Sequence, residues 1–167
     1  MQFLIETTLG NITIELDAKA APVSAKNFAD YVSESFYDGT VFHRVIPTFM
    51  IQGGGHTADL AKKQTKGSIQ NEWRNGLKNL RGAVSYARLG GNPDSATSQF
   101  FINVVDNPFL DNPQSDGAAY AVFGKVVDGM DVVDKIRVVP TGHRGGMGDV
   151  PVKPVMIESI RAVAAAV

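Results

Sequence analysis

Eight short β-type segments, separated by turn-forming residues, constrain the fold of this chain more than any other feature of its sequence. They are rich in β-branched and aromatic residues, and Gly, Pro, Asn and Asp lie between them, which is typical of strands joined by turns. Gly10 and Asn11 separate the first two segments and predict a hairpin there. We expect strands over residues 3–8, 12–16, 41–46, 49–52, 83–88, 99–105, 120–127 and 154–162.

Only two segments have the spacing of a helix. Pro22 suits a first helical turn, and large apolar residues follow at near-helical spacing over residues 22–36. A second helix is expected over residues 130–137. Two helices are too few to cover both faces of a parallel sheet. The pattern therefore predicts a mainly β protein, an antiparallel barrel or sandwich.

The length of 167 residues suits one domain, and we expect a single domain over residues 1–167. Two stretches, 53–82 and 105–119, are rich in Gly, Asn, Asp and Pro, and loops of this length are often functional. Residues 164–166 are expected to be a frayed terminus.

Charge and cysteine content exclude several function classes. The 16 basic and 17 acidic residues give a net charge of −1, so no overall field attracts nucleic acid or an anionic membrane. Without cysteine there is no disulfide, thiolate metal site or thiol nucleophile. Residues 1–20 lack the features of a secretory signal, and no apolar run is long enough to span a bilayer. We expect a cytoplasmic monomer.

The usual catalytic and cofactor motifs are absent or lack their context. The three histidines have neither the spacing nor the carboxylate neighbours of a zinc site, and there is no G-x-S-x-G motif. Residues 53–58 formally match G-x-G-x-x-A, but no helix that could pack on a sheet follows them. We interpret these glycines as a turn that closes a strand, and we expect neither a metal nor a cofactor.

Arg44 is the most informative polar residue, because it lies within a largely apolar run, residues 42–54. An unpaired buried charge is costly, so a guanidinium kept there needs a partner or a function. Gln52 lies near the end of the same run, and Gln99 begins a second polar-to-apolar junction at residues 98–103. Each residue alone has a structural explanation, whereas the whole set indicates a site.

Three motifs resemble the signature of the cyclophilins, the cyclosporin-binding class of peptidyl-prolyl cis–trans isomerases. They are F-H-R-V-I-P-x-F-M-x-Q-G-G at residues 42–54, S-A-T-S-Q-F-F-I at 95–102, and V-F-G-K-V at 122–126 followed by G-M at 129–130. Their order and spacing match, and the similarity extends from the first strand to the last. The short first loop, residues 86–88 and residues 109–110 resemble the bacterial cytosolic subgroup most.

The resemblance implies an eight-stranded antiparallel closed β-barrel capped by two helices, with a peptide groove on its outer face. It implies an enzyme that rotates X-Pro bonds in client proteins and so assists folding, with Arg44 as the catalytic residue and Gln52 holding Arg44 in place. The proline pocket would be formed by Phe49, Met50, Phe101, Leu110 and Tyr120, and the rest of the groove by His43, Ile46, Ala87, Arg88, Gln99 and Phe109.

Three positions depart from the pattern of eukaryotic cyclophilins. Phe109 stands where those proteins have Trp, Tyr120 where they have His, and Arg88 where they have Asn. These differences are compatible with catalysis and predict weak binding of cyclosporin-type inhibitors.

Rotation about a peptide bond makes and breaks no bond, which fits a chain without a recognisable nucleophile, base or metal site. Two other classes stay open from the sequence. One is a module that binds proline-containing segments without turnover, and the other is a nucleotide-dependent enzyme that uses the glycines at 53–58.

Overall fold

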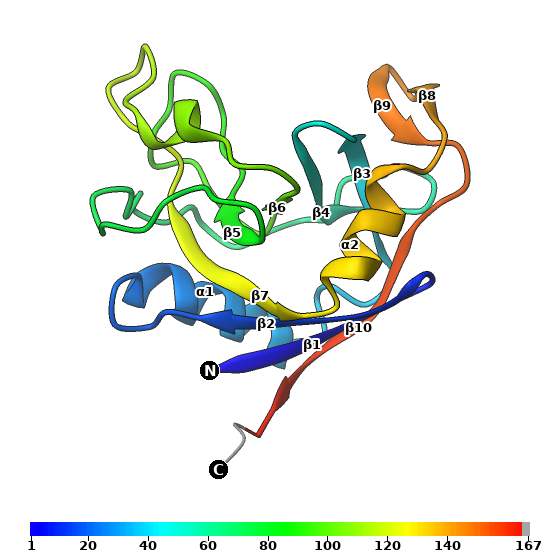
Figure 1. The fold of residues 1–167 in the computed structure, drawn as a ribbon, viewed down its shortest axis with the longest axis horizontal. Coiled ribbons are helices and arrows are strands. Elements are labelled where there is room, and N and C mark those ends of the chain that lie inside the picture. Colours follow the sequence, from blue (N-terminus) through cyan, green and yellow to red (C-terminus); the bar gives the residue numbers. More distant parts are fainter. Residues whose placement is uncertain (165–167) are drawn as a thin grey trace.

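The computed structural model describes residues 1–164 and contains a closed barrel of eight antiparallel strands (Figure 1). The barrel confirms the expected fold and decides against a sandwich; the expected fraying of residues 165–166 lies outside the described residues. In barrel order the strands are β1 (Gln2–Thr7), β10 (Met156–Val163), β3 (Thr40–Ile46), β4 (Met50–Thr57), β6 (Phe100–Asn103), β5 (Ala83–Tyr86), β7 (Val122–Asp128) and β2 (Gly10–Leu16), which pairs with β1.

The alternation of the first two strands shows why they pair. In β1 and β2 every second side chain is buried, and Ile5, Ile12 and Ile14 are fully enclosed. This period of two places one face of the hairpin in the core and the other in solvent. The predicted hairpin is confirmed, but its turn lies at Thr8 and Leu9, because Gly10 and Asn11, where the turn was expected, belong to β2 and pair with β1.

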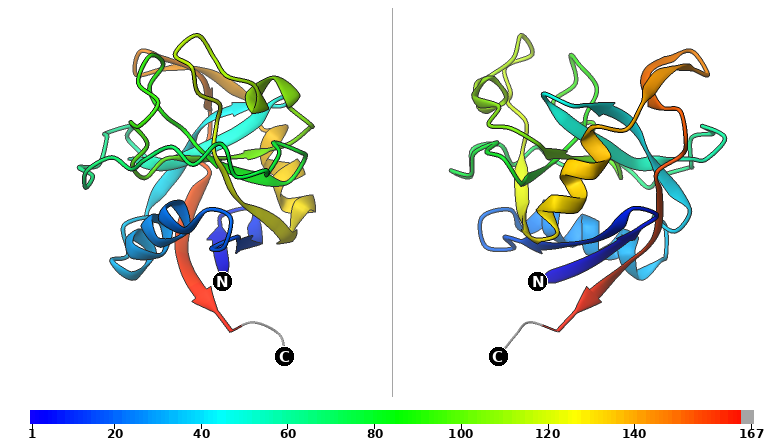
Figure 2. Two further views of the ribbon diagram at one scale, coloured as in Figure 1. Left: turned by 90° about the vertical axis from the view of Figure 1, so that its left-hand side faces the viewer. Right: turned by 45° about the vertical axis from the view of Figure 1, so that its right-hand side comes forward.

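Helices α1 (Pro22–Ser33) and α2 (Met130–Arg137) lie on opposite sides of the barrel and bury their apolar faces in one core (Figure 2). Phe28 of α1 packs edge-on against Phe3 and Phe100, with ring centroids 5.3 and 5.5 Å apart. The first helix ends three residues earlier than expected, and Ser35 beyond it has a φ of 55°. Neither helix of residues 1–164 is long and apolar enough to cross a membrane.

The glycines at 53–55 lie inside β4, so the expectation of a turn that closes a strand is wrong. A Cβ on Gly53 would lie 2.7 Å from the carbonyl oxygen of Val41, and one on Gly54 would lie 2.9 Å from the rings of Tyr37 and Phe100. These glycines let neighbouring groups approach the backbone closely. Their function in packing removes the support for a dinucleotide-binding turn.

A β-bulge in β3 decides which way Arg44 points. Phe42 pairs with Gly53 and Arg44 pairs with Gln52, so one residue of β4 is matched by two of β3, and His43 is the additional residue. Without the bulge, Phe42 and Arg44, two positions apart, would face the same side of the strand. With it, Phe42 is fully buried in the core and Arg44 is exposed on the outer face.

Two short strands and a 3₁₀ helix were not expected from the sequence. Strands β8 (Thr141–Arg144) and β9 (Met147–Pro151) form a hairpin outside the barrel, and η1 (Pro108–Asp111) lies in the second long loop. All four residues of β8 are exposed, so the segment has no burial pattern that its sequence could reveal.

Candidate active site

Arg44, Gln52 and Phe101 are direct neighbours on three adjacent strands. Arg44 of β3 is opposite Gln52 of β4, and Gln52 is opposite Phe101 of β6. Phe100 and Ile102, on either side of Phe101, belong to the barrel core, so alternation turns Phe101 to the outer face. The barrel thus aligns in one row three side chains that are up to 57 positions apart in the sequence.

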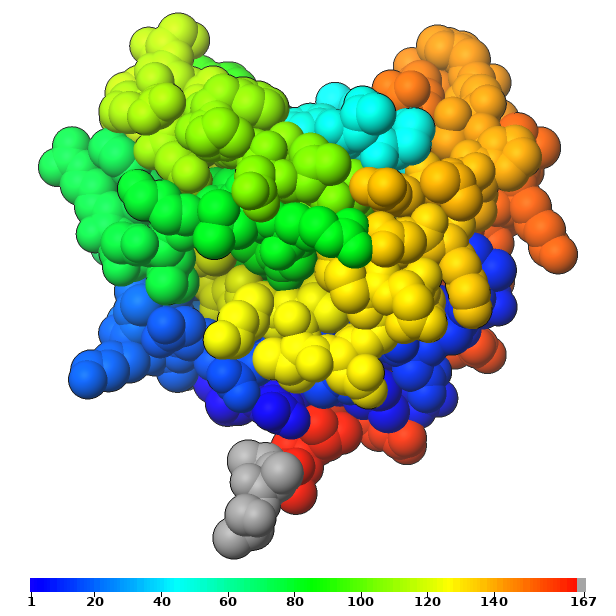
Figure 3. Space-filling model, in the orientation of Figure 1, coloured from blue at the N-terminus to red at the C-terminus, as the bar shows by residue number. Residues whose placement is uncertain are grey.

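This row forms part of a pocket of about 280 Å³. In the space-filling view the surface is hollowed between the segment around residues 105–120 and the β8–β9 hairpin, above residues around 45–50 (Figure 3). A buried cluster of Met50, Phe101 and Leu110, separate from the barrel core, is part of the pocket. The lining residues are Arg44, Phe49, Met50, Gln52, Ala87, Arg88, Phe101, Phe109, Leu110, Gln114 and Tyr120.

Three residues that the sequence assigned to the groove do not line this pocket. Ile46 packs against the buried cluster, and Gln99 lies next to Gln52, whose side-chain amide donates to Gln99 Oε1 at 3.0 Å. His43 lies with the β8–β9 hairpin instead, in a small cavity bounded by Leu60, Arg144 and Val150 among others.

The Arg44 guanidinium is held by no side chain of residues 1–164. It forms no ion pair there, and the amide of Gln52 is bonded to Gln99 rather than to Arg44. A guanidinium carries five N–H donors. Those of Arg44 therefore remain free for a bound molecule at the edge of the pocket.

The guanidinium of Arg88, in contrast, is engaged within the protein through both terminal nitrogens, while its buried Nε has no hydrogen-bond partner among the described residues. Its side chain is 2% exposed, and it donates to both oxygens of Asp116 at 2.6 and 3.1 Å and to the carbonyl oxygen of Ala118 at 2.8 Å. It also lies 4.7 Å from the ring centroid of Tyr120, and its hydrogen bonds lower the pKa of Asp116. Arg88 thus anchors the loop that carries one wall of the pocket.

Removal of the Asp116 carboxylate should therefore impair the pocket. In Asp116→Ala the Arg88 charge stays buried without its partner, which is more damaging than loss of the pair. We expect a lower melting temperature and a roughly 10-fold lower kcat/KM toward a proline peptide, because Tyr120 and the loop lose their anchor. The double variant Arg88→Met/Asp116→Leu should recover much of the stability. Unchanged kinetics in Asp116→Ala would show that the loop is held without this ion pair.

His43 and His56 form a second group of titratable residues, next to the site. Their ring centroids are 4.2 Å apart, and neither Nδ1 atom has a hydrogen-bond partner within the described residues. Burial, and then the charges of His56 and Arg44, lower the pKa of His43 to about 4. Burial and the charge of Lys62 also lower the pKa of His56.

Acidification should destabilise the protein through His43. The unfolded chain takes up a proton at its ordinary pKa of 6.5, whereas the folded protein keeps this imidazole neutral down to about pH 4. Between these values the unfolded state binds more protons, so the free energy of unfolding is greatest above pH 6.5 and falls as the pH drops, by up to about 3 kcal/mol.

Urea unfolding between about pH 7 and pH 4 measures this effect. His43→Gln should flatten the dependence, whereas His143→Gln, which changes an exposed residue of β8, should follow the unmodified protein. An equally steep fall in His43→Gln would assign the acid sensitivity to other groups.

Gln114 lines the pocket but was missed from the sequence. Its side-chain amide donates to the carbonyl oxygens of Phe109 and Asn112 at 2.9 and 2.8 Å and so closes the loop after η1. The only sequence feature that could have pointed to Gln114 was its position in the long loop segment 105–119. No motif distinguishes it from the other polar residues there.

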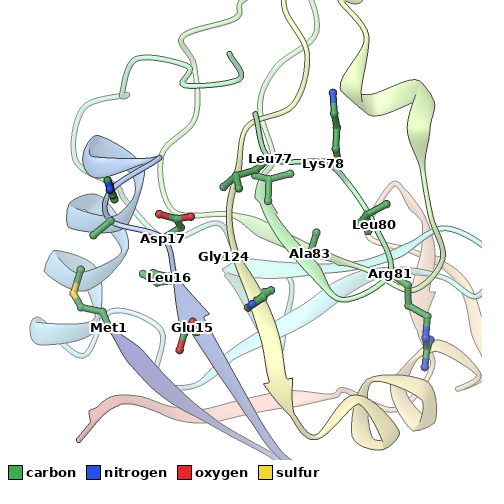
Figure 4. Close-up of a pocket in the computed structure, with 14 residues that line it drawn as sticks. Met1, Glu15, Leu16, Asp17, Leu77, Lys78, Leu80, Arg81, Ala83 and Gly124 are labelled. Atoms are coloured by element: carbon green, nitrogen blue, oxygen red, sulfur yellow. The ribbon is translucent and has the colours of Figure 1, made fainter. Parts of the chain in front are cut away.

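A larger cavity of about 590 Å³ lies on another part of the surface (Figure 4). Leu16, Leu77 and Leu80 contribute to its wall, and its arginine, Arg81, is engaged by Asp134 at 2.7 and 2.8 Å. It contains none of the residues that the sequence assigned to the site. Size alone therefore does not single out a candidate active site here, whereas free donors beside a buried apolar cluster do.

Comparison with known proteins agrees with this geometry. Residues 2–162 match the family model described as cyclophilin type peptidyl-prolyl cis-trans isomerase/CLD. Peptidyl-prolyl cis-trans isomerase A of Dickeya dadantii is 56% identical over 160 residues, covering 96% of this chain and 83% of the relative. Peptidyl-prolyl cis-trans isomerase B of Escherichia coli is 53% identical over 156 residues, covering 92% and 94%.

A solved structure extends the comparison to the fold. The cyclophilin type peptidyl-prolyl cis-trans isomerase of Cryptosporidium parvum, crystallised in the presence of the dipeptide Ala-Pro, superposes with a TM-score of 0.82 at 26% identity. The alignment covers 99% of this chain and 100% of that one. The closed eight-stranded barrel is thus the shared fold.

Barrel, motifs and relatives define a protein of the prolyl isomerase class. The chain belongs to the cyclophilin-type peptidyl-prolyl cis–trans isomerase family, and it is a peptidyl-prolyl cis–trans isomerase.

Proposed function

We propose that the 280 Å³ pocket is the active site, in which Arg44 stabilises the twisted X-Pro amide while the apolar walls hold the proline ring. The observation that carries this proposal is the row Arg44–Gln52–Phe101, which places free guanidinium donors beside a buried apolar cluster. The Cryptosporidium relative was crystallised in the presence of the dipeptide Ala-Pro, which supports a proline-containing occupant.

The barrier to rotation about the X-Pro bond determines how much activation free energy the site must remove. Amide resonance gives the X-Pro bond a barrier of about 18–20 kcal/mol, and uncatalysed exchange takes roughly 10–100 s. A turnover of about 10³ s⁻¹ requires that the site lower this barrier by about 7 kcal/mol.

Arg44 suits the main part of this task. In the planar amide the nitrogen lone pair is delocalised and accepts hydrogen bonds poorly, whereas in the twisted amide it is localised and basic. A donor aimed at that nitrogen binds the twisted state better than either planar isomer, which is the condition for catalysis. A preorganised donor contributes about 3–4 kcal/mol, by analogy with oxyanion holes. Binding of the proline ring in the pocket and desolvation of the amide carbonyl supply the remaining reduction of the barrier.

Gln52 and Phe101 complete the arrangement. The hydrogen bond to Gln99 fixes the Gln52 amide and leaves its Oε1 as an acceptor for the neighbouring Arg44 when substrate is bound. Phe101 contacts the proline ring together with Phe49, Met50, Leu110 and Tyr120. Arg88 shapes this wall through Asp116, and Ala87 and Phe109 border it.

The site needs no group that titrates near neutrality. A guanidinium cannot be deprotonated in a protein, and His43 stays neutral above about pH 5 because its pKa is about 4. We therefore expect kcat/KM to stay nearly constant over the range in which stability begins to fall on acidification.

A protease-coupled assay with a Suc-Ala-X-Pro-Phe type peptide tests the proposal. The unmodified protein should accelerate isomerisation, and Arg44→Ala should abolish most of that acceleration while peptide binding persists. Equal acceleration by both would show that Arg44 is not the catalytic group, and no acceleration by the unmodified protein would favour a module that binds proline segments without turnover.

Cyclosporin should inhibit this protein weakly. Phe109 is 55% exposed, its ring lies 5.6 Å from that of Phe49, and it offers no N–H donor, unlike the indole of Trp. Phe109→Trp should tighten inhibition roughly 5- to 10-fold, the worth of one hydrogen bond, with little change in turnover. Inhibition of the same assay by cyclosporin measures both. Tight inhibition of the unmodified protein would refute this interpretation of Phe109.

The proposed partners are exposed proline-containing segments of client proteins, on which one chain acts as a single catalytic unit. We also propose that the protein acts in the cytoplasm as a monomer. Cell fractionation and size-exclusion chromatography test these two assignments.

A further inference from the structure

Three buried asparagines form a continuous hydrogen-bonded ladder behind the pocket. Asn79, Asn103 and Asn107 are 1%, 0% and 4% exposed. The amide of Asn103 donates to Asn79 Oδ1 at 3.0 Å, and that of Asn107 donates to Asn103 Oδ1 at 2.7 Å. Asparagine is seldom buried in a protein interior, so three in one chain of bonds require an explanation.

One end of the ladder holds the Phe49 side of the pocket. The Asn107 amide donates to the carbonyl oxygen of Phe49 at 3.0 Å, and the backbone N–H of Val104 donates to the same oxygen at 3.1 Å. Phe49 is the last residue of the turn between β3 and β4 and lines the pocket. Its backbone position therefore depends on Asn107.

The other end holds the opposite wall. The backbone N–H and side-chain amide of Asn79 donate to Asp111 Oδ1 at 2.7 and 2.9 Å, and the amide also reaches the carbonyl oxygen of Tyr120 at 3.3 Å. Asp111 follows Leu110 in η1, and Leu110 and Tyr120 both line the pocket. The ladder therefore spans from one wall to the other.

Asn103, the middle residue of the ladder, is fixed to the strands that form the floor of the pocket. Asn103 lies in β6, two residues beyond Phe101 and opposite Met50, and it donates to the carbonyl oxygen of Ala83 at 3.2 Å. Asn79 Oδ1 accepts a further hydrogen bond from Ser85 at 2.6 Å. The neighbours of Asn79, Leu77 and Lys78 before it and Leu80 after it, line the separate cavity of Figure 4, so this segment turns only Asn79 inward.

Apart from Asn107 Oδ1, every side-chain amide atom of the ladder has a hydrogen-bond partner within the described residues. A buried network satisfied in this way fixes geometry, because each amide accepts and donates in only a few directions and an unpaired one is costly. Apolar side chains would fill the same space without setting the distance between the two walls.

We propose that Asn79, Asn103 and Asn107 are positioning residues that hold the two walls of the proline pocket at the spacing needed to grip the ring. The inference rests on the proposed function of the pocket. The three residues act through Phe49, Leu110 and Tyr120 and do not line the pocket themselves. Small displacements of such walls reduce both binding and the rate of the bound substrate.

Asn107→Ala tests the proposal, because it removes the bonds to Phe49 and to Asn103 together. Below its melting temperature, the folded variant should show a higher KM for the proline peptide and a lower kcat, with kcat/KM reduced at least roughly 10-fold. Asn107→Thr retains one hydroxyl donor and should recover much of this loss. It also provides a folded comparison if the alanine variant does not fold.

Asn27→Ala is the matched control. The Asn27 amide also donates two hydrogen bonds, to the Tyr86 hydroxyl at 3.0 Å and to the carbonyl oxygen of Thr97 at 2.7 Å, but it lies on α1. This variant should lose stability and keep kcat and KM. Kinetics of Asn107→Ala within about twofold of the unmodified protein, or an equal kinetic loss in Asn27→Ala, would overturn the proposal.

Arg44→Ala, measured in parallel, separates this inference from the function on which it rests. If Arg44→Ala is inactive and Asn107→Ala has normal kinetics, only the ladder proposal is wrong. If Arg44→Ala is fully active, the pocket is not the catalytic site, and the positioning proposal is overturned with it.

Discussion

Arg44→Ala is expected to lower kcat/KM for isomerisation of a proline peptide by at least about 10²-fold, which is the loss for one preorganised donor to a transition state. The loss should lie mainly in kcat, because the hydrogen bond is strongest when the amide is twisted. The fold should be little affected, since Arg44 is exposed and forms no ion pair within residues 1–164. The coupled protease assay and thermal unfolding measure the two effects.

Two further variants, Arg44→Lys and Arg161→Ala, test whether the loss is specific to the guanidinium of Arg44. Lysine keeps the charge but lacks the planar fork that allows one group to be both held and aimed, so it should rescue poorly. Arg161 lies on β10, is exposed and pairs with Glu6, so its removal controls for loss of a surface arginine. An Arg44→Ala enzyme within a few-fold of the unmodified one would rule out the mechanism.

Phe101→Ala should damage both activity and stability. The side chain is 4% exposed and packs with Met50 and Leu110, and truncation of a buried phenylalanine costs about 3–5 kcal/mol. The same change removes a large part of the surface that would hold the proline ring, so KM should rise and kcat/KM should fall at least 10-fold, roughly what about 1.4 kcal/mol of lost contact produces. Leu110→Ala should be milder on stability and should also weaken peptide binding.

The adjacent Phe100 supplies the control. It is fully buried, but it faces the barrel core and packs against Phe28, Tyr37 and Phe42. Phe100→Leu and Phe101→Leu should therefore both destabilise the protein, whereas only Phe101→Leu should change the kinetics of the folded enzyme. Equal stability losses with intact activity in both would make Phe101 a core residue and move the proline pocket elsewhere.

The barrel was predictable because its strands carry their pattern locally. Alternating β-branched residues, as in Ile12-Thr13-Ile14, reveal a half-buried strand without any knowledge of its partners. The hairpin at residues 141–151 carries no such pattern, because all four residues of β8 are exposed to solvent. Alternation of apolar and polar residues reflects the burial of one face of a strand, so an exposed strand carries no alternation from which it could be predicted.

Only those residues of the candidate site that belong to the three sequence motifs could be predicted. Whether Arg88 faces a ligand or an internal partner depends on Asp116, 28 positions away in a loop, and no local pattern states that pairing. The asparagines of the ladder appear in the sequence as ordinary turn formers. Their burial follows from the folding of the loops over the barrel, which is a tertiary effect.

The β-bulge at His43 has a consequence for how this enzyme can vary. Phe42 and Arg44 face opposite sides of β3 although His43 lies between them, because the bulge takes up this one residue without changing the pairing on either side. Adjacent residues of a regular strand also face opposite sides, so loss of the codon for His43 would leave Phe42 inward and Arg44 outward, whereas a deletion in the regularly paired residues 44–46 would turn the side chains beyond it to the opposite face. Variation in the length of β3 is therefore expected at His43 rather than at residues 44–46.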